Sequence, residues 1–292
     1  MASLRLDTAR EDLYAEFSHN KKGVSPEQQK LAYVAAKAFM QRYGGEDDDT
    51  YVKEARQFVR DYEREISRYA VFAAFNAKNY LKTFELGRPL LALDRENFFV
   101  LGVLSEAGYE NALAKNATLN DETIDYLRRA IQLLAGGKVT KPDPFKSREA
   151  ADGFLNLALG SLIKDKAPVE AAAAFTRAVQ PKSPYASDPL TYYRLGVAIL
   201  KGPYAQLSTE YNEKFGAKQS SAEQQAALAE LNTLTTRALD AYARAVALSD
   251  PARPAPAPPA TQFTPEFRSK LLDQLTALYK VCTTIPTPVL RN

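Results

Sequence analysis

Two stretches of the sequence repeat one pattern: AAAAFTRA at 171–178 and ALDAYARA at 238–245. Each holds a small residue, an aromatic residue four positions later and a small residue three positions after that. These residues are Ala171, Phe175 and Ala178 in the first stretch and Ala238, Tyr242 and Ala245 in the second. Residues three and four apart share one face of an α-helix. Each stretch therefore predicts a helix whose alanines allow a neighbouring helix to approach closely, while the aromatic ring fills the gap toward the next helix pair.

Leucine followed by glycine recurs in the first helix of three expected helix pairs. The pairs are Leu101-Gly102, Leu159-Gly160 and Leu195-Gly196. Between Glu27 and Lys141 the chain contains a single proline, Pro89. Proline breaks a helix because it removes a backbone donor and clashes with the preceding turn, so a long stretch with so few prolines favours helix. No alternating strand pattern occurs either, and the chain is therefore expected to be all-α.

Caps and apolar spacing place the helices individually. The expected ranges are 7–18, 26–43, one from about 50, then 80–93, 95–115, 120–135, 147–164, 168–180, 188–200, 204–215, 221–249 and 264–281. The segments between them hold turn formers, and one such predicted break is Gly202-Pro203.

These paired helices resemble tetratricopeptide repeats, whose unit has Leu-Gly in its first helix, Ala, Phe or Tyr and Ala in its second, and Asp-Pro before the next unit. The resemblance implies an α-solenoid, a superhelix of antiparallel helix pairs. The expected parts are N-terminal helices at 1–63, degenerate repeats at 64–250 with an insertion at 203–222, a proline-rich linker at 251–263, and a C-terminal capping helix and tail at 264–292.

The resemblance also implies a function: a non-enzymatic interaction module or scaffold that binds a peptide or helix of a partner protein in a concave groove lined by the first helices. Aligning the units implies that the groove residues are Arg68, Phe72, Phe75, Glu96, Phe99, Val103, Glu106, Lys164, Tyr193 and Val197. The lysine and asparagine set with which some relatives clamp a C-terminal carboxylate does not occur here as a set. An alternative is a structural or peripheral subunit of a larger assembly, including one at a membrane.

Composition argues against other classes of function. The net charge is only +3, from 38 Lys and Arg against 35 Asp and Glu, which argues against a dedicated nucleic-acid binder. One histidine, His19 in an expected polar turn, and one cysteine, Cys282, exclude paired-histidine and multi-cysteine metal sites. No cofactor, no metal ion and no group of catalytic residues is expected, so an all-helical enzyme is the least favoured interpretation.

Location is expected to be cytoplasmic. No run of residues approaches the ~18 apolar residues of a membrane span, and the first residues lack the apolar core of a signal peptide. A periplasmic or secreted protein whose signal has been removed is the alternative.

Overall fold

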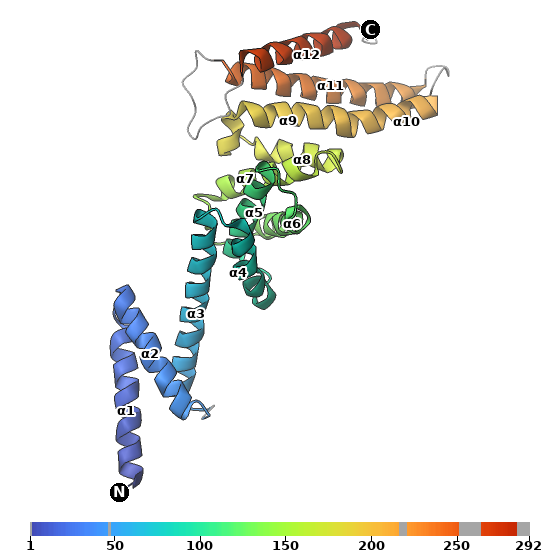
Figure 1. The fold of residues 1–292 in the computed structure, drawn as a ribbon. Helices are drawn as coiled ribbons and strands as arrows, with labels where there is room; N and C mark the ends of the chain where they lie inside the picture. Colours follow the sequence, from blue (N-terminus) through green and yellow to red (C-terminus); the bar gives the residue numbers. More distant parts are fainter. Residues whose placement is uncertain (1, 46–47, 216–220, 251–263, 285–292) are drawn as a thin grey trace. The chain divides into compact units, whose positions relative to one another are not determined.

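The computed structural model describes residues 2–45, 48–215, 221–250 and 264–284 (Figure 1). Within these ranges every regular element is a helix, which confirms the all-α prediction. The helices are α1 (Ala2–Lys21), α2 (Pro26–Tyr43), α3 (Thr50–Asn76), α4 (Tyr80–Leu93), α5 (Phe98–Leu113), α6 (Asn120–Ala135), α7 (Arg148–Ile163), α8 (Pro168–Ala178), α9 (Pro189–Ile199), α10 (Ala205–Phe215), α11 (Ala222–Leu248) and α12 (Pro265–Thr284). A 3-10 turn, η1 (Pro184–Ser187), precedes α9, and a π-helical turn, η2 (Leu200–Tyr204), follows it.

Local chemistry explains where these helices begin. The Ser25 hydroxyl accepts from the backbone of Gln28, whose side chain accepts in return from the Ser25 backbone, and Pro26 occupies the first helical position of α2. Asp49, Ser147, Asp188 and Ser221 cap α3, α7, α9 and α11 in a similar way, each accepting a backbone N–H of the first turn. The predicted proline-rich linker, 251–263, and the tail beyond residue 284 lie outside the described residues.

The chain divides into two compact units, residues 1–93 and 94–292. In the first unit, α1 packs on α2, α2 on α3 and α3 on α4. Phe17, Phe39 and Val52 are fully buried in a core shared by the first three helices. Position 63/64, where repeats were expected to begin, lies within the continuous helix α3. His19 lies in the last turn of α1 and not in the predicted polar turn, because the helix continues to Lys21.

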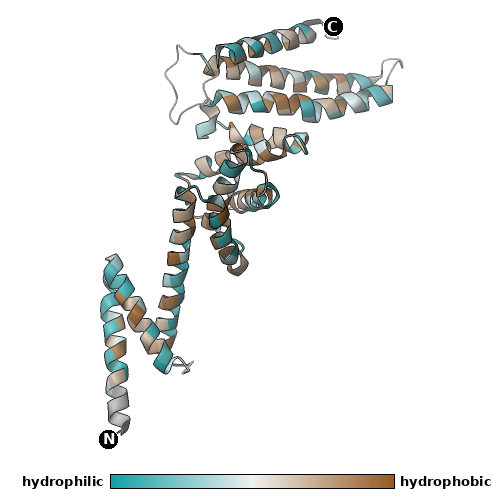
Figure 2. Ribbon diagram, viewed as in Figure 1, coloured by the Kyte–Doolittle hydropathy of each residue, from teal (hydrophilic) through white to brown (hydrophobic). Residues whose placement is uncertain are grey.

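In the second unit, consecutive helices pack as neighbours: α5 on α6, α6 on α7, α7 on α8, α8 on α9, and α9 on α11. Hydrophobic and hydrophilic residues are interleaved along α9, α11 and α12, as expected of helices with one buried side (Figure 2). The unit is thus a series of packed helix pairs.

Glycine and an aromatic ring meet inside two of these pairs. A β-carbon placed on Gly160 of α7 would lie 3.0 Å from the ring of Phe175 on α8. One placed on Gly196 of α9 would lie 2.9 Å from the ring of Tyr242 on α11. The ring of the second helix therefore rests directly on the backbone of the first. This contact gives the Leu-Gly pair and the small-aromatic-small pattern a shared physical cause.

The chain does not break at Gly202-Pro203, as the sequence predicted. Instead α9 continues through η2 into α10, so the described first part of the segment expected as an insertion (203–222), residues 203–215, lengthens the first helix of the pair. A π turn is a local widening of a helix, and such turns are a known way to accommodate irregular hydrogen bonding next to proline. Gly202 is required here because a β-carbon would lie 2.6 Å from the backbone of Pro168 at the start of α8.

Helix α12 packs on α11. Leu271 is its buried contact, at 1% exposure, and the ring of Phe267 meets Tyr193 of α9 edge-on with the centroids 5.0 Å apart. Arg268 lies 4.0 Å from Asp250. The side chain of Cys282, near the end of this helix, lies outside the described ones.

Candidate functional site

Arg194 on α9 joins three elements of the second unit. Its guanidinium donates to the hydroxyl of Tyr109 on α5 and to the hydroxyl of Ser161 on α7, both at 3.3 Å. Helices α5, α7 and α9 are the first members of their pairs, so a single side chain links the first helices of three successive pairs. The rings of Tyr109 and Phe154 meet edge-on at 5.8 Å and pack the same surface between α5 and α7.

A carboxyl group lies beside this junction. Burial raises the pKa of Glu106 on α5 to about 7, and the charge of Glu110 one turn later adds to the rise. Burial also raises the pKa of Tyr185 in η1 to about 12, with Glu106 as the next contribution. The two groups therefore lie near each other in a partly desolvated part of the surface, where α5 is close to the turn that precedes α9.

Basic residues surround a small pocket at the other end of the same surface. It has a volume of about 210 Å³ and lies between the C-terminus of α7 and helix α9. Three of the predicted groove residues, Lys164, Tyr193 and Val197, line it together. Arg194 and Lys201 also line it, against one acidic residue, Asp165. The pocket therefore combines an apolar wall, which includes Phe175, with an excess of positive charge.

We call this surface the first-helix strip. It consists of Glu106, Tyr109, Ser161, Lys164, Tyr185, Tyr193, Arg194, Val197 and Lys201. Its two ends share Arg194, which both bonds Tyr109 and lines the pocket. An elongated ligand could therefore contact an ionisable carboxyl, aromatic rings and a basic pocket along one line of residues.

The remaining predicted groove residues lie outside this strip. Val103 is fully buried, so it contributes to packing and not to a groove. Glu96 is exposed and pairs with Lys138 at 2.6 Å, and Phe99 is half-buried. Arg68, Phe72 and Phe75 belong to α3 in the first unit, where Arg68 pairs with Glu65 at 3.2 Å and the two phenylalanine rings lie 6.4 Å apart.

Sequence reasoning missed Tyr109, Tyr185 and Arg194. Arg194 lies directly before a Leu-Gly pair, but its hydrogen-bond partners, Tyr109 and Ser161, lie on two other helices. Tyr185 lies between Pro181 and Pro189, a segment interpreted only as a break. Its placement depends on η1 folding back against α7, which local sequence does not encode.

In the described part of the chain, no helix is long and apolar enough to cross a membrane. No family model matches the chain, and no curated protein or solved structure matches it either.

Proposed function

We propose that the second unit is a tetratricopeptide-like scaffold that binds a peptide or helix of a partner protein along the first-helix strip. The observation that carries the proposal is the position of Arg194, which bonds Tyr109 and Ser161 and also lines the pocket with Lys164, Tyr193 and Val197. In a repeat array, the first helices form the surface along which an extended partner lies.

The composition of the strip supports a protein ligand. Tyrosine and arginine are enriched among the residues that dominate binding energy at protein interfaces, because each combines an apolar body with a polar end. The strip holds three tyrosines and one arginine, with lysines at the edge of its pocket. The excess of positive charge favours a partner segment that carries acidic residues near its apolar anchor.

Affinity capture from the native source with matched variants tests the proposal. The double variant Lys164→Glu, Lys201→Glu reverses the charge of the pocket, while Lys141→Glu, Lys182→Glu makes the same charge change at exposed lysines outside it. For a protein captured by the unaltered chain, we expect the captured amount to fall roughly tenfold or more with the first double variant and to stay the same with the second. Equal capture by both double variants would contradict the proposal.

A further inference from the structure

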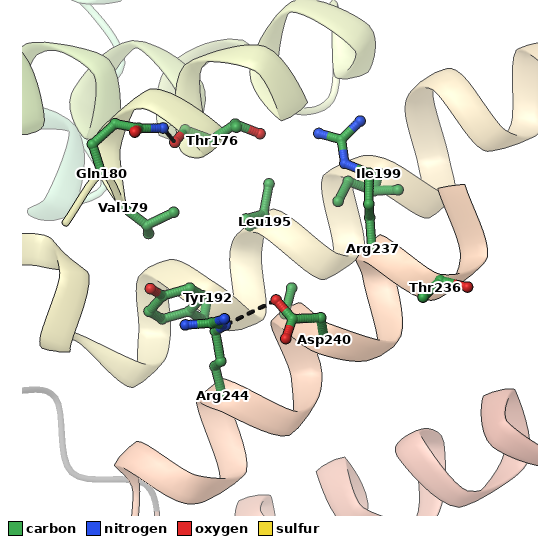
Figure 3. Close-up of a pocket in the computed structure, with 11 residues that line it drawn as sticks. Thr176, Val179, Gln180, Tyr192, Leu195, Ile199, Thr236, Arg237, Asp240 and Arg244 are labelled. Carbon is green, nitrogen blue, oxygen red and sulfur yellow. Dashed lines mark hydrogen bonds and ion pairs between the residues drawn. The ribbon is translucent and has the colours of Figure 1, made fainter. Parts of the chain in front are cut away.

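A second groove opens on a different face of α9. It has a volume of about 560 Å³ and lies between α8, α9 and α11 (Figure 3). Tyr192, Leu195 and Ile199 line it from α9, whereas the pocket of the first-helix strip is lined by Tyr193, Val197 and Lys201 of the same helix. At 100° per residue these two sets point to nearly opposite sides of the helix. The groove is therefore separate from the strip.

The floor of this groove is apolar. Leu195 and Ile199 are only 7% and 1% exposed and form its buried base with Ala241 of α11, and the half-buried Val179, which directly follows α8, adds accessible apolar surface. Helix α8 ends at Ala178, whereas α11 begins at Ala222, several turns before the groove, and ends at Leu248, about one turn past Arg244. The groove thus lies between a short second helix and a long one.

The rim of the groove is polar and carries more positive than negative charge. Arg244 donates to Asp240 at 2.8 Å, and its guanidinium lies 5.8 Å from the centroid of the Tyr192 ring. Arg237 lies one turn before Asp240 on the same face of α11, is exposed, and has no ion-pair partner among the described residues. Figure 3 shows the Arg237 side chain extending from α11 toward the side of the groove on which α8 and Thr176 lie.

We propose that this groove binds an acidic amphipathic segment of a partner protein, with an apolar side chain on Val179 and Leu195 and a carboxylate paired with Arg237. Charge complementarity selects this occupant: Asp240 already neutralises Arg244, so one cationic group remains beside an apolar floor. An apolar centre with a polar rim that includes arginine and tyrosine is the usual anatomy of a protein interface. The groove uses a face that the first-helix strip leaves free, so this site goes beyond the proposed function.

A displayed peptide library provides the probe. Its members are helical peptides with apolar residues fixed on one face and the polar positions randomised among Glu, Lys, Gln and Ser, and it is panned on the full chain. We expect the selected peptides to be enriched in Glu. Their affinity should fall roughly tenfold or more for Arg237→Glu, which reverses the rim charge, and for Gln180→Trp, which places an indole over the groove.

Two controls separate this groove from other surfaces. Arg177→Glu makes the same charge reversal on the exposed part of α8 outside the groove, and Lys201→Glu acts on the first-helix strip. Neither control substitution should weaken the binding of the selected peptides. Circular dichroism of all four variants should match that of the unaltered chain. The proposal is overturned if the selected peptides lack Glu enrichment, if Gln180→Trp leaves binding intact, or if either control weakens binding as much as Arg237→Glu.

Discussion

At the scale of single residues, the contact between glycine and an aromatic ring explains the recurring sequence pattern. Gly196→Ala would place a methyl group 2.9 Å from the ring of Tyr242, which is itself buried at 3% exposure. We expect the variant to lose roughly 1–3 kcal/mol in the free energy of unfolding, because the ring must move away from the α9 backbone. Urea titration measures the loss. Gly45→Ala is the control, since nothing lies within 4 Å of the added methyl group, and equal loss in both variants would contradict the account.

The alanines of the same pattern give a second prediction. Ala171 is fully buried in α8, whereas Ala173 is exposed on the same helix. Ala171→Leu should overpack the contact between α7 and α8 and lower the free energy of unfolding by roughly 1–3 kcal/mol, while Ala173→Leu should change it little. Thermal melts of the two variants make the comparison, and a melting temperature for Ala171→Leu equal to that of the unaltered chain would show that the repeat register is wrong.

The carboxyl group of Glu106 makes stability depend on pH. Its pKa is about 7 in the folded chain, above the ordinary value of 4.5, because burial disfavours the charged form. The folded state therefore binds more protons than the unfolded state between these values, and the contribution of Glu106 is complete below pH 4.5 and lost as the pH rises through 7.

Glu106→Gln should remove this dependence. At pH 8 the variant should be more stable than the unaltered chain by on the order of 1–3 kcal/mol, and near pH 4 the two should be similar. Urea titrations at several pH values measure the difference. Glu230→Gln, at an exposed position, is the control and should follow the unaltered chain at every pH. A constant offset between Glu106→Gln and the unaltered chain across pH would mean that the carboxyl does not titrate in this range.

At the scale of elements, α12 covers the last helix pair through one row of contacts. Leu271 is 1% exposed, whereas its neighbour Leu272 is 40% exposed. Leu271→Ala should cost roughly 2 kcal/mol or more, because it removes buried methyl groups and leaves a cavity against α11, and Leu272→Ala should cost much less. Thermal unfolding followed at 222 nm distinguishes the two. Equal melting temperatures would mean that α12 is not a cap of the array.

Helix starts that carry a capping residue were predictable from the sequence. Ser25-Pro26 and Asp49 cap their helices in the structure as their chemistry requires, so the starts of α2 and α3 could be placed from sequence. The segment at Gly202-Pro203 could not, because glycine and proline ordinarily end a helix. Here the helix continues through a π turn, and Gly202 leaves room for the Pro168 backbone, a tertiary contact that the local sequence does not show.

At the scale of the whole molecule, part of the candidate site could likewise be predicted from the sequence and part could not. Lys164, Tyr193 and Val197 could be brought together from repeat spacing alone, because equivalent positions of successive first helices face the same way. Tyr185 and Arg194 could not, since their roles depend on side chains from α5, α7 and η1 that meet only in the folded unit. Val103 was wrong for a related reason: its side chain is fully buried, and spacing along one helix does not report what lies against it.

The central claim is that the first-helix strip holds the partner, and cross-linking from within it tests this most directly. A photo-reactive amino acid replaces Val197, which lines the strip's pocket, and in a matched chain replaces Ala92, which is exposed on α4 outside both proposed binding surfaces. Both chains are irradiated in the native source and the cross-linked proteins are identified by mass spectrometry. The account predicts a partner cross-linked from position 197 and absent from position 92. A partner cross-linked equally from both positions, or from 92 alone, would contradict it.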